Sequence, residues 1–346
     1  MTICLDNTVV PRGRVHARGA HIVQIEGAGI LAHEVCMRGA AAYVAAIFER
    51  SFYLCAGEIF LCVGEPTIGH GPLTLIAGTG VHLSGLNLRP DEPAVISEQE
   101  IIIGERVRFC LDPCEVWRPP SWPNAAPPDT LREACGALAR RVNAAGPGLA
   151  PVVFGAPAPT PFARIASERI AQFQTWLVNA HTCGNKIGSP SFAVRDLIGL
   201  GPGLTPAGDD LLAGALAALD AFGEAEARGV LAHAIMLALP GRTSPLSACL
   251  LRAACAGHVG ERLHKAVSAL LVGDVEAAIE AAECIGHSSG WDMLAGAAAV
   301  SLIRGKCLEN FRRFAGVGMN LFPDNAQRDF QKVSAKRAVE LGKFRP

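Results

Sequence analysis

The pattern of hydrophobic and polar positions changes once along the chain, near residue 119. Before that point, short apolar runs rich in β-formers alternate with Gly-rich turns, which predicts strands. The expected strands cover residues 15–25, 58–63, 73–77, 81–86 and 100–110, and the Ala-rich residues 38–48 are predicted to form a helix. The first 118 residues are therefore expected to form a mainly β domain.

After residue 164, Ala and Leu recur at helical spacing. The predicted helices cover residues 165–180, 209–222, 225–239, 246–257, 263–271, 275–284 and 292–303. Between the two patterns, prolines recur around one predicted helix, residues 130–143, which is typical of a linker. The sequence thus predicts an α+β protein with a β domain (1–118), a Pro-rich linker (119–163), a helical domain (164–318) and a polar tail (319–346).

The length of the chain favours two domains, and its charge balance argues against a nucleic-acid-binding protein. The chain has 346 residues, and at about 150 residues per domain this length favours two domains. Lys plus Arg number 31 and Asp plus Glu 32, so no net charge attracts nucleic acid or an anionic membrane surface. We therefore expect no nucleic-acid partner.

The sequence shows no secretory signal, no membrane-spanning segment and no cysteine spacing typical of a metal site. The N-terminus lacks the basic start and apolar core of a secretory signal. Two stretches without charged residues, 66–88 and 142–163, contain glycines or prolines that disfavour a spanning helix. The 12 cysteines show no C-x-x-C spacing and are expected to be reduced thiols rather than metal ligands. A cytoplasmic protein with no membrane partner is predicted.

A Gly- and Pro-rich loop opens one of the predicted helices. Residues 199–208 read GLGPGLTPAG, and Asp209 and Asp210 follow before an apolar run. Glycines let the backbone approach a ligand closely, and the unpaired amides at a helix start favour an anion. We therefore predict a phosphate or carboxylate site in this loop, lined by Gly201, Gly203, Thr205 and Gly208.

The start of this helix is repeated further along the same predicted domain. Residues 208–215 (GDDLLAGA) and 290–297 (GWDMLAGA) share the pattern G-x-D-x-L-A-G-A. In each copy an Asp lies in the first turn, and a Gly four residues later lies on the same face, where another helix can approach closely. The repeat predicts two helices side by side, with Asp210 and Asp292 near one another.

Further candidate polar residues lie in three other loops. Residues 285–290 precede the second copy, residues 240–247 precede another predicted helix, and His70 lies in a Gly-rich turn of the β domain. If these segments converge, they form a site for a phosphorylated or carboxylated small molecule. The candidate catalytic residues are Asp209, Asp210, His287 and Asp292, and the further candidate substrate-binding residues are His70, Arg242, Thr243, Ser244, Arg252, Ser288 and Ser289.

Other interpretations stay open. Ser, Thr and Asp at helix starts often act only as N-caps or first-turn acids, although this does not explain a Gly-rich loop with two acids that is repeated. Asp209 and Asp210 are also suited to Mg²⁺ held through a phosphate; otherwise no metal or cofactor is predicted. Neither the P-loop nor the Rossmann glycine pattern fits the loop.

Three segments resemble the signature blocks of the AllH-type family: residues 199–214, 242–257 (RTSPLSACLLRAACAG) and 285–296 (IGHSSGWDMLAG). The resemblance is strong over residues 196–303, and in the β domain it is best over residues 69–75 (GHGPLTL). It implies a subunit of oxamate carbamoyltransferase, which interconverts oxalurate plus phosphate with oxamate plus carbamoyl phosphate in anaerobic allantoin breakdown. The implied partners are a small anionic substrate and the other subunits of an oligomeric enzyme, including one similar to acyl-CoA synthetases.

The implied chemistry agrees with an anion site at helix starts. As a hypothesis, the amides of residues 201–208 hold phosphate, Arg242 or Arg252 binds a carboxylate, and His287 with Asp210 or Asp292 handles protons. The S-T-R-T-R motif of ordinary carbamoyltransferases is absent, so a different fold is expected. The alternatives are a noncatalytic assembly subunit and a small-anion-binding regulatory protein.

Overall fold

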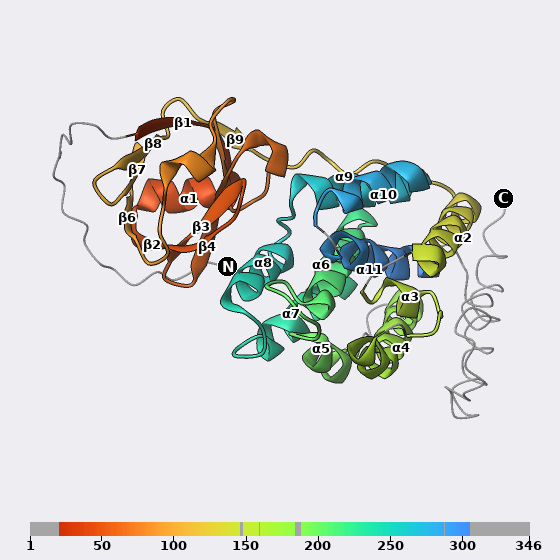
Figure 1. The fold of residues 1–346 in the computed structure, drawn as a ribbon. Coiled ribbons are helices and arrows are strands. Elements are labelled where there is room, and N and C mark those ends of the chain that lie inside the picture. The colour runs from red at the N-terminus through yellow and green to blue at the C-terminus, as the bar shows by residue number, and fades with distance from the viewer. Residues whose placement is uncertain (1–20, 146–147, 159, 184–187, 287, 305–346) are drawn as a thin grey trace, which may run out of the picture.

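The computed structural model describes residues 21–145, 148–158, 160–183, 188–286 and 288–304. Strands gather in the N-terminal part and helices in the C-terminal part, which confirms the α+β class (Figure 1). His287, a predicted catalytic residue, and the tail lie outside the described residues.

The N-terminal strands form a closed β-barrel. Within the described residues the sheet runs in the order β5-β4-β3-β2-β6-β7-β8-β1-β9, and β5 also pairs with β1 to close it. Apolar side chains that alternate along the strands fill the interior, including Phe52, Leu61 and Phe109. The strands are β1 (His21–Gly29), β2 (Ala40–Ile47), β3 (Ser51–Ala56), β4 (Ile59–Gly64), β5 (Thr74–Ala77), β6 (Pro93–Ile96), β7 (Glu100–Ile103), β8 (Val107–Cys110) and β9 (Glu115–Trp117).

The predicted helix over residues 38–48 is wrong. This segment forms β2, while the helix α1 (Ile30–Arg38) lies immediately before it. Gly39, at φ +70°, ends α1 by donating its amide to the carbonyls of Val35 and Cys36. The predicted strand over residues 81–86 is also wrong, because a short 3₁₀ helix, η2 (Leu83–Leu86), follows a turn there; another, η1 (Pro66–Ile68), precedes the turn of His70.

The C-terminal part is helical, and its helices share one core. The predicted helices from residue 165 onward are confirmed within a few residues at each end, while α5 was not predicted. The helices are α2 (Pro128–Ala145), α3 (Ala150–Val153), α4 (Pro161–Cys183), α5 (Ser191–Leu197), α6 (Ala207–Ala221), α7 (Ala225–Ala238), α8 (Pro245–Cys255), α9 (Glu261–Val272), α10 (Val275–Glu283) and α11 (Ser289–Arg304). Leu138 of α2 and Val153 of α3 are buried in the same core as α6 and α11, so the Pro-rich segment packs closely against the later helices.

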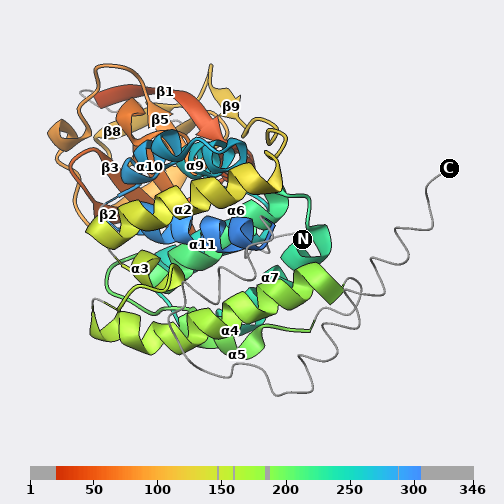
Figure 2. The same cartoon turned by 90° about the vertical axis from the view of Figure 1, so that its right-hand side faces the viewer.

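The two copies of the sequence repeat form the centre of this core. Helices α6 and α11 lie against each other and are covered by α2, α3, α4, α9 and α10 (Figures 1 and 2). A Cβ at Gly214 would overlap the carbonyl oxygen of Met293, and one at Gly296 would overlap that of Leu211. Leu211 and Met293 are equivalent positions of the repeat, so the packing is reciprocal, and it confirms the predicted close approach.

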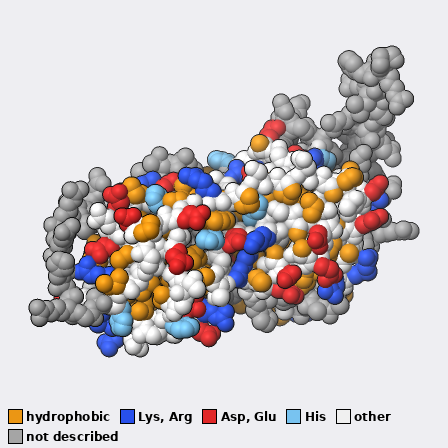
Figure 3. Space-filling model, turned by 90° about the horizontal axis from the view of Figure 1, so that it is seen from above, with side chains coloured by type: hydrophobic (Ala, Val, Ile, Leu, Met, Phe, Trp, Pro, Cys, Tyr) orange, Lys and Arg blue, Asp and Glu red, His pale blue; other side chains and the backbone are white. Residues whose placement is uncertain are grey.

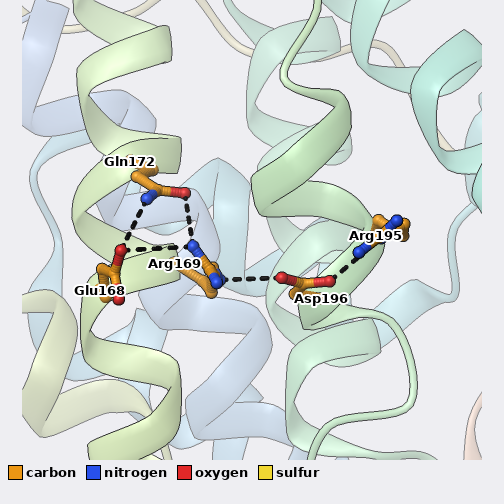
Figure 4. A network of polar contacts seen from close by, with 5 residues as sticks. All are labelled: Glu168, Arg169, Gln172, Arg195 and Asp196. Carbon is orange, nitrogen blue, oxygen red and sulfur yellow. Dashed lines mark hydrogen bonds and ion pairs between the residues drawn. The ribbon is translucent and has the colours of Figure 1, made fainter.

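Polar contacts hold α5 in place just before the Gly-rich loop. Arg169 of α4 pairs with Asp196 of α5 at 2.9 Å, and Arg195 pairs with the other oxygen of that carboxylate at 3.2 Å (Figure 4). Arg169 also contacts Glu168 and Gln172 on its own helix. Because the loop starts directly after α5, this network fixes the position from which the loop leaves.

The barrel contacts the helical part through α8 and α9. The amide of Phe60 in β4 lies 3.4 Å from the Cys249 sulfur of α8, and this cysteine is buried in the barrel's apolar cluster. His70 and Glu261 exchange two hydrogen bonds, from Glu261 N to His70 O at 2.8 Å and from His70 N to the Glu261 carboxylate at 2.9 Å. The turn around His70 is therefore fastened to the start of α9.

Other expectations concern the surface and the thiols. Acidic and basic side chains are interspersed over the face seen in Figure 3. In the described part of the chain, no helix combines the length and apolarity needed to cross a membrane. The cysteines whose side chains are described form no disulfide bond with one another.

Candidate functional site

Asp209 joins three segments at the start of α6. Its Oδ1 accepts a hydrogen bond from Gly199 N at 2.8 Å, and its Oδ2 accepts from the hydroxyls of Thr243 and, at 2.6 Å, Ser247. The residue is 1% exposed, so no water competes for these bonds. Since both oxygens are engaged, Asp209 holds the Gly-rich loop and the start of α8 together, and it has little freedom to act on a ligand.

Asp210, next in sequence, has a different environment. Hydrogen bonds with Ser289 and Thr205 lower the pKa of its carboxyl, but burial raises it more, and the negative charges of Asp292 and Asp209 add to the rise. The net pKa lies well above the ordinary value. The hydroxyls of Thr205 and Ser289 lie 3.0 Å apart, so this cluster joins both copies of the repeat.

Asp292 is the equivalent residue of the second copy and is fully buried. Its Oδ1 accepts a hydrogen bond from Leu149 N at 2.6 Å, and the amide of Ala150 also contributes. Burial nevertheless raises the pKa of this carboxyl to about 7. Gly148, at φ +70°, lies so close that a Cβ there would overlap both carboxylate oxygens, so only glycine fits.

The structure thus brings together the two aspartates that the repeat predicted to be near one another. Each has one oxygen, Oδ2, that is buried without a hydrogen-bond partner. Thr205 and Ser289 are only partly buried, so they connect these carboxyls with the surface. A pair of buried carboxyls with raised pKa values is suited to storing and transferring a proton near neutral pH.

The amides of the Gly-rich loop divide into two groups. The Gly208 amide donates to Leu200 O at 2.9 Å, so it is already used within the protein. Gly201, at φ +117°, packs its backbone against Ala207 at the start of α6. Gly203, at φ +99°, is exposed. Of the predicted anion-binding amides, those of Gly201 and Gly203 are therefore better placed than that of Gly208.

Ser244 and Thr243 have structural contacts. Ser244 is the N-cap of α8: its hydroxyl accepts from Ser247 N at 3.0 Å and donates to Leu204 O at 2.5 Å. This agrees with the alternative that polar residues at helix starts act as caps. Thr243 donates to Asp209, as described above. Both residues thus support the Gly-rich loop from the side of α8.

The remaining candidates lie apart from the carboxyl cluster or at its edge. Arg252 pairs with Glu58 of the barrel at 3.0 Å, and His70 stacks on Trp117 with ring centroids 5.7 Å apart. Arg242 is exposed beside the loop, where its carbonyl lies against Gly199. The Ser288 carbonyl accepts the Asp292 amide at 3.0 Å, within the first turn of α11.

The backbone contribution of Gly148 and Leu149 was not predicted. The sequence does contain a pattern that points to this contribution, because residues 146–149 repeat the GPGL of residues 201–204. The second of these segments begins the turn toward Asp210, and the first ends at the amide that binds Asp292. Leu149, at the end of the first segment, and Thr205, directly after the second, each form a hydrogen bond with one of the two equivalent aspartates.

The contacts also bear on metal binding. Because both oxygens of Asp209 accept hydrogen bonds from the protein, the Asp209–Asp210 pair offers only one free carboxylate to Mg²⁺. Over the described ranges, no group of three or more His, Cys, Asp or Glu side chains is arranged to hold a metal ion.

The raised pKa values predict that the protein loses stability as pH rises. The folded protein binds a proton on Asp292 more tightly than the unfolded chain does, so stability falls between the ordinary carboxyl pKa and about 7. Asp210 acts in the same direction. At about 1.4 kcal/mol per pKa unit, we expect wild type to lose about 3 kcal/mol or more from pH 5 to 8 relative to the Asp210→Asn, Asp292→Asn double variant.

Urea unfolding of both proteins across this pH range measures the difference. The half-buried His258 and the buried His264 have pKa values that burial lowers, and they act in the opposite direction. They are present in both proteins, so their effect cancels in the comparison. Parallel pH curves for wild type and variant would contradict the raised pKa values.

Comparison with known proteins gives a match to a family model over part of the chain. No curated protein and no solved structure matches the chain significantly. The model of the family described as oxamate carbamoyltransferase subunit AllH matches residues 197–301. This range runs from the end of α5 into α11 and contains Asp209, Asp210 and Asp292. Residues 197–301 are therefore similar to the AllH family, as their resemblance to its signature blocks predicted.

Proposed function

We propose that this chain is a subunit of a carbamoyltransferase that interconverts oxalurate plus phosphate with oxamate plus carbamoyl phosphate. It acts together with other subunits, one of them similar to acyl-CoA synthetases, and the cluster around Asp210 and Asp292 is its reaction site. The observation that carries the proposal is that this cluster lies inside the segment matched by the AllH family.

The proton balance of the reaction fits two carboxyls with raised pKa values. Phosphate attacks the ureido carbon of oxalurate, the bond from that carbon to the nitrogen of the oxamate part breaks, and this nitrogen must gain a proton. The attacking hydrogen phosphate loses one proton. Asp210 in its protonated form donates to the leaving nitrogen and Asp292 accepts from phosphate, so the pair relays one proton and no other reactant is needed.

Charge imposes a second requirement, since phosphate and oxalurate are anions. Protonation of Asp210 removes a negative charge from the site and thereby weakens its repulsion of both substrates. The amides of Gly201 and Gly203 and the hydroxyls of Thr205 and Ser289 supply donors to phosphate oxygens, and Arg242 at the loop edge binds the substrate carboxylate. His287, also a candidate for proton transfer, lies outside the described residues.

Turnover of the assembled enzyme tests the proposal. Asp210→Asn, combined with the partner subunits, is expected to lower the rate of oxalurate phosphorolysis by about 100-fold, because Asn keeps the shape but cannot donate a carboxyl proton. Glu276→Gln removes one negative charge from α10, where the side chain is 75% exposed, and is expected to leave the rate unchanged.

Assembly must be measured beside the rate. Size-exclusion chromatography of the reconstituted complex is expected to show that Asp210→Asn still joins its partners. If the variant assembles and turns over like wild type, catalysis does not use this cluster. The chain is then a noncatalytic assembly subunit.

A further inference from the structure

Two buried oxygens of the cluster lack the partners that buried oxygens normally have. Oδ2 of Asp210 and Oδ2 of Asp292 accept no hydrogen bond within the protein, although the two residues are only 3% and 0% exposed. An unpaired buried polar atom costs about 1–3 kcal/mol. Such atoms in native structures therefore call for an explanation, and a bound ligand or water is the ordinary one.

The chemistry of these oxygens limits what can bind them. An ionised carboxylate only accepts hydrogen bonds, and a protonated one donates one and accepts others. One protonated and one ionised carboxyl thus present one donor and several acceptors. A carboxylate brings only acceptors, and hydrogen phosphate brings a single donor, so neither group satisfies both free oxygens.

A primary amide does satisfy them. Its NH₂ group donates two hydrogen bonds and its carbonyl accepts one, which matches a carboxylate beside a carboxylic acid. The other contacts of the pair are already fixed, since Leu149 N holds Oδ1 of Asp292 and the hydroxyls of Ser289 and Thr205 serve Asp210. The free oxygens therefore face no competing donor among the described residues.

We infer that Asp210 and Asp292 form the recognition site for the primary amide of the substrate, while the anionic groups of the same substrate lie toward the Gly-rich loop. This inference rests on the proposed function and extends it. It assigns the carboxyl pair to the primary amide of oxamate, whose nitrogen is the one that gains a proton when oxalurate is cleaved, and it separates that amide from the anion-binding amides of the loop.

Selection between oxamate and oxalate tests the inference without catalysis. The two ligands have the same size, but oxalate replaces the amide with a second carboxylate. In titration calorimetry with the full chain at fixed pH and ionic strength, we expect oxamate to bind about tenfold more tightly than oxalate. Asp292→Asn is expected to reduce this preference to within about twofold, because one acceptor becomes a donor and one negative charge is removed.

Two control titrations test whether the preference for oxamate depends on the carboxyl pair itself. Glu276→Gln, which changes the charge on an exposed part of α10, is expected to keep the wild-type preference. Mg²⁺ alone is titrated as a third probe, since a carboxyl pair also attracts cations. Heat released by Mg²⁺ that disappears in Asp292→Asn would assign the pair to a cation and overturn the inference.

The remaining outcomes separate this inference from the proposed function. Equal affinity for oxamate and oxalate, no binding of either, or an unchanged preference in Asp292→Asn overturns amide recognition. If oxamate is preferred but Asp210→Asn does not slow the assembled enzyme, the chain recognises amides and the proposed catalytic role falls. If Asp210→Asn slows the enzyme but no preference exists, only amide recognition falls.

Discussion

Gly214→Ala is expected to lower the free energy of unfolding by about 3 kcal/mol, which corresponds to a fall in Tm of roughly 10 °C. The added Cβ would overlap the Met293 carbonyl, which is backbone and cannot turn aside as a side chain can. Helices α6 and α11 would have to separate at the centre of the core. Gly296→Ala, at the equivalent position against Leu211, is expected to have a similar effect.

Gly229→Ala is the matched control. This glycine lies in α7, and a Cβ there would meet no atom within contact distance. Ala in an exposed helical position is expected to raise stability by up to about 1 kcal/mol. Thermal unfolding of the three variants gives the comparison. If Gly214→Ala and Gly229→Ala have the same Tm, the reciprocal glycine contact does not determine how α6 and α11 pack.

The close packing of α6 on α11 was predictable because its cause is local in the sequence. Both copies of G-x-D-x-L-A-G-A place a glycine on the same face as an Asp, and small residues mark a close helix contact. The same repeat predicted that Asp210 and Asp292 lie near one another, and the packing of α6 on α11 and the 3.0 Å contact between the hydroxyls of Thr205 and Ser289 bring the starts of the two helices together. A repeated sequence thus predicted a pair of contacts that depend on tertiary structure.

Other features had no such signal. The Ala-rich residues 40–47 have a high helical preference, but β2 is held on both sides by β3 and β6, and this pairing overrides the preference. The hydrogen bond from Leu149 to Asp292 comes from a backbone amide, which every residue except proline has. Sequence alone does not show which amide in a chain is brought to which carboxylate.

The sequence also did not distinguish the two adjacent aspartates. Asp209 and Asp210 were both candidates for catalysis, yet one has all its oxygens bonded to the protein and the other keeps one free. The difference arises from helical geometry, since neighbouring residues point about 100° apart around a helix and so face different segments. Asp209 faces α8, and Asp210 faces the start of α11.

This division predicts opposite behaviour for substitutions at the two positions. Asp209→Ala removes a buried carboxylate that accepts three hydrogen bonds and leaves Gly199 N and the hydroxyls of Thr243 and Ser247 without their acceptor. With about 1.5 kcal/mol or more for each bond to a charged group, we expect a loss of about 4 kcal/mol in the free energy of unfolding. Asp210→Asn, in contrast, is expected to keep the fold and stability near those of wild type at pH 7.

Urea unfolding at pH 7 measures the free energy of unfolding of both variants, and Asp274→Ala is the control. Asp274 is the exposed N-cap of α10, and its carboxylate accepts one side-chain hydrogen bond, from Ala277 N at 3.1 Å, so its removal is expected to cost about 1 kcal/mol. If Asp209→Ala costs no more than Asp274→Ala, Asp209 does not hold the loop and α8 together. It would then be free to serve as a ligand, and the assignment of the chemistry to Asp210 and Asp292 alone would have to be abandoned.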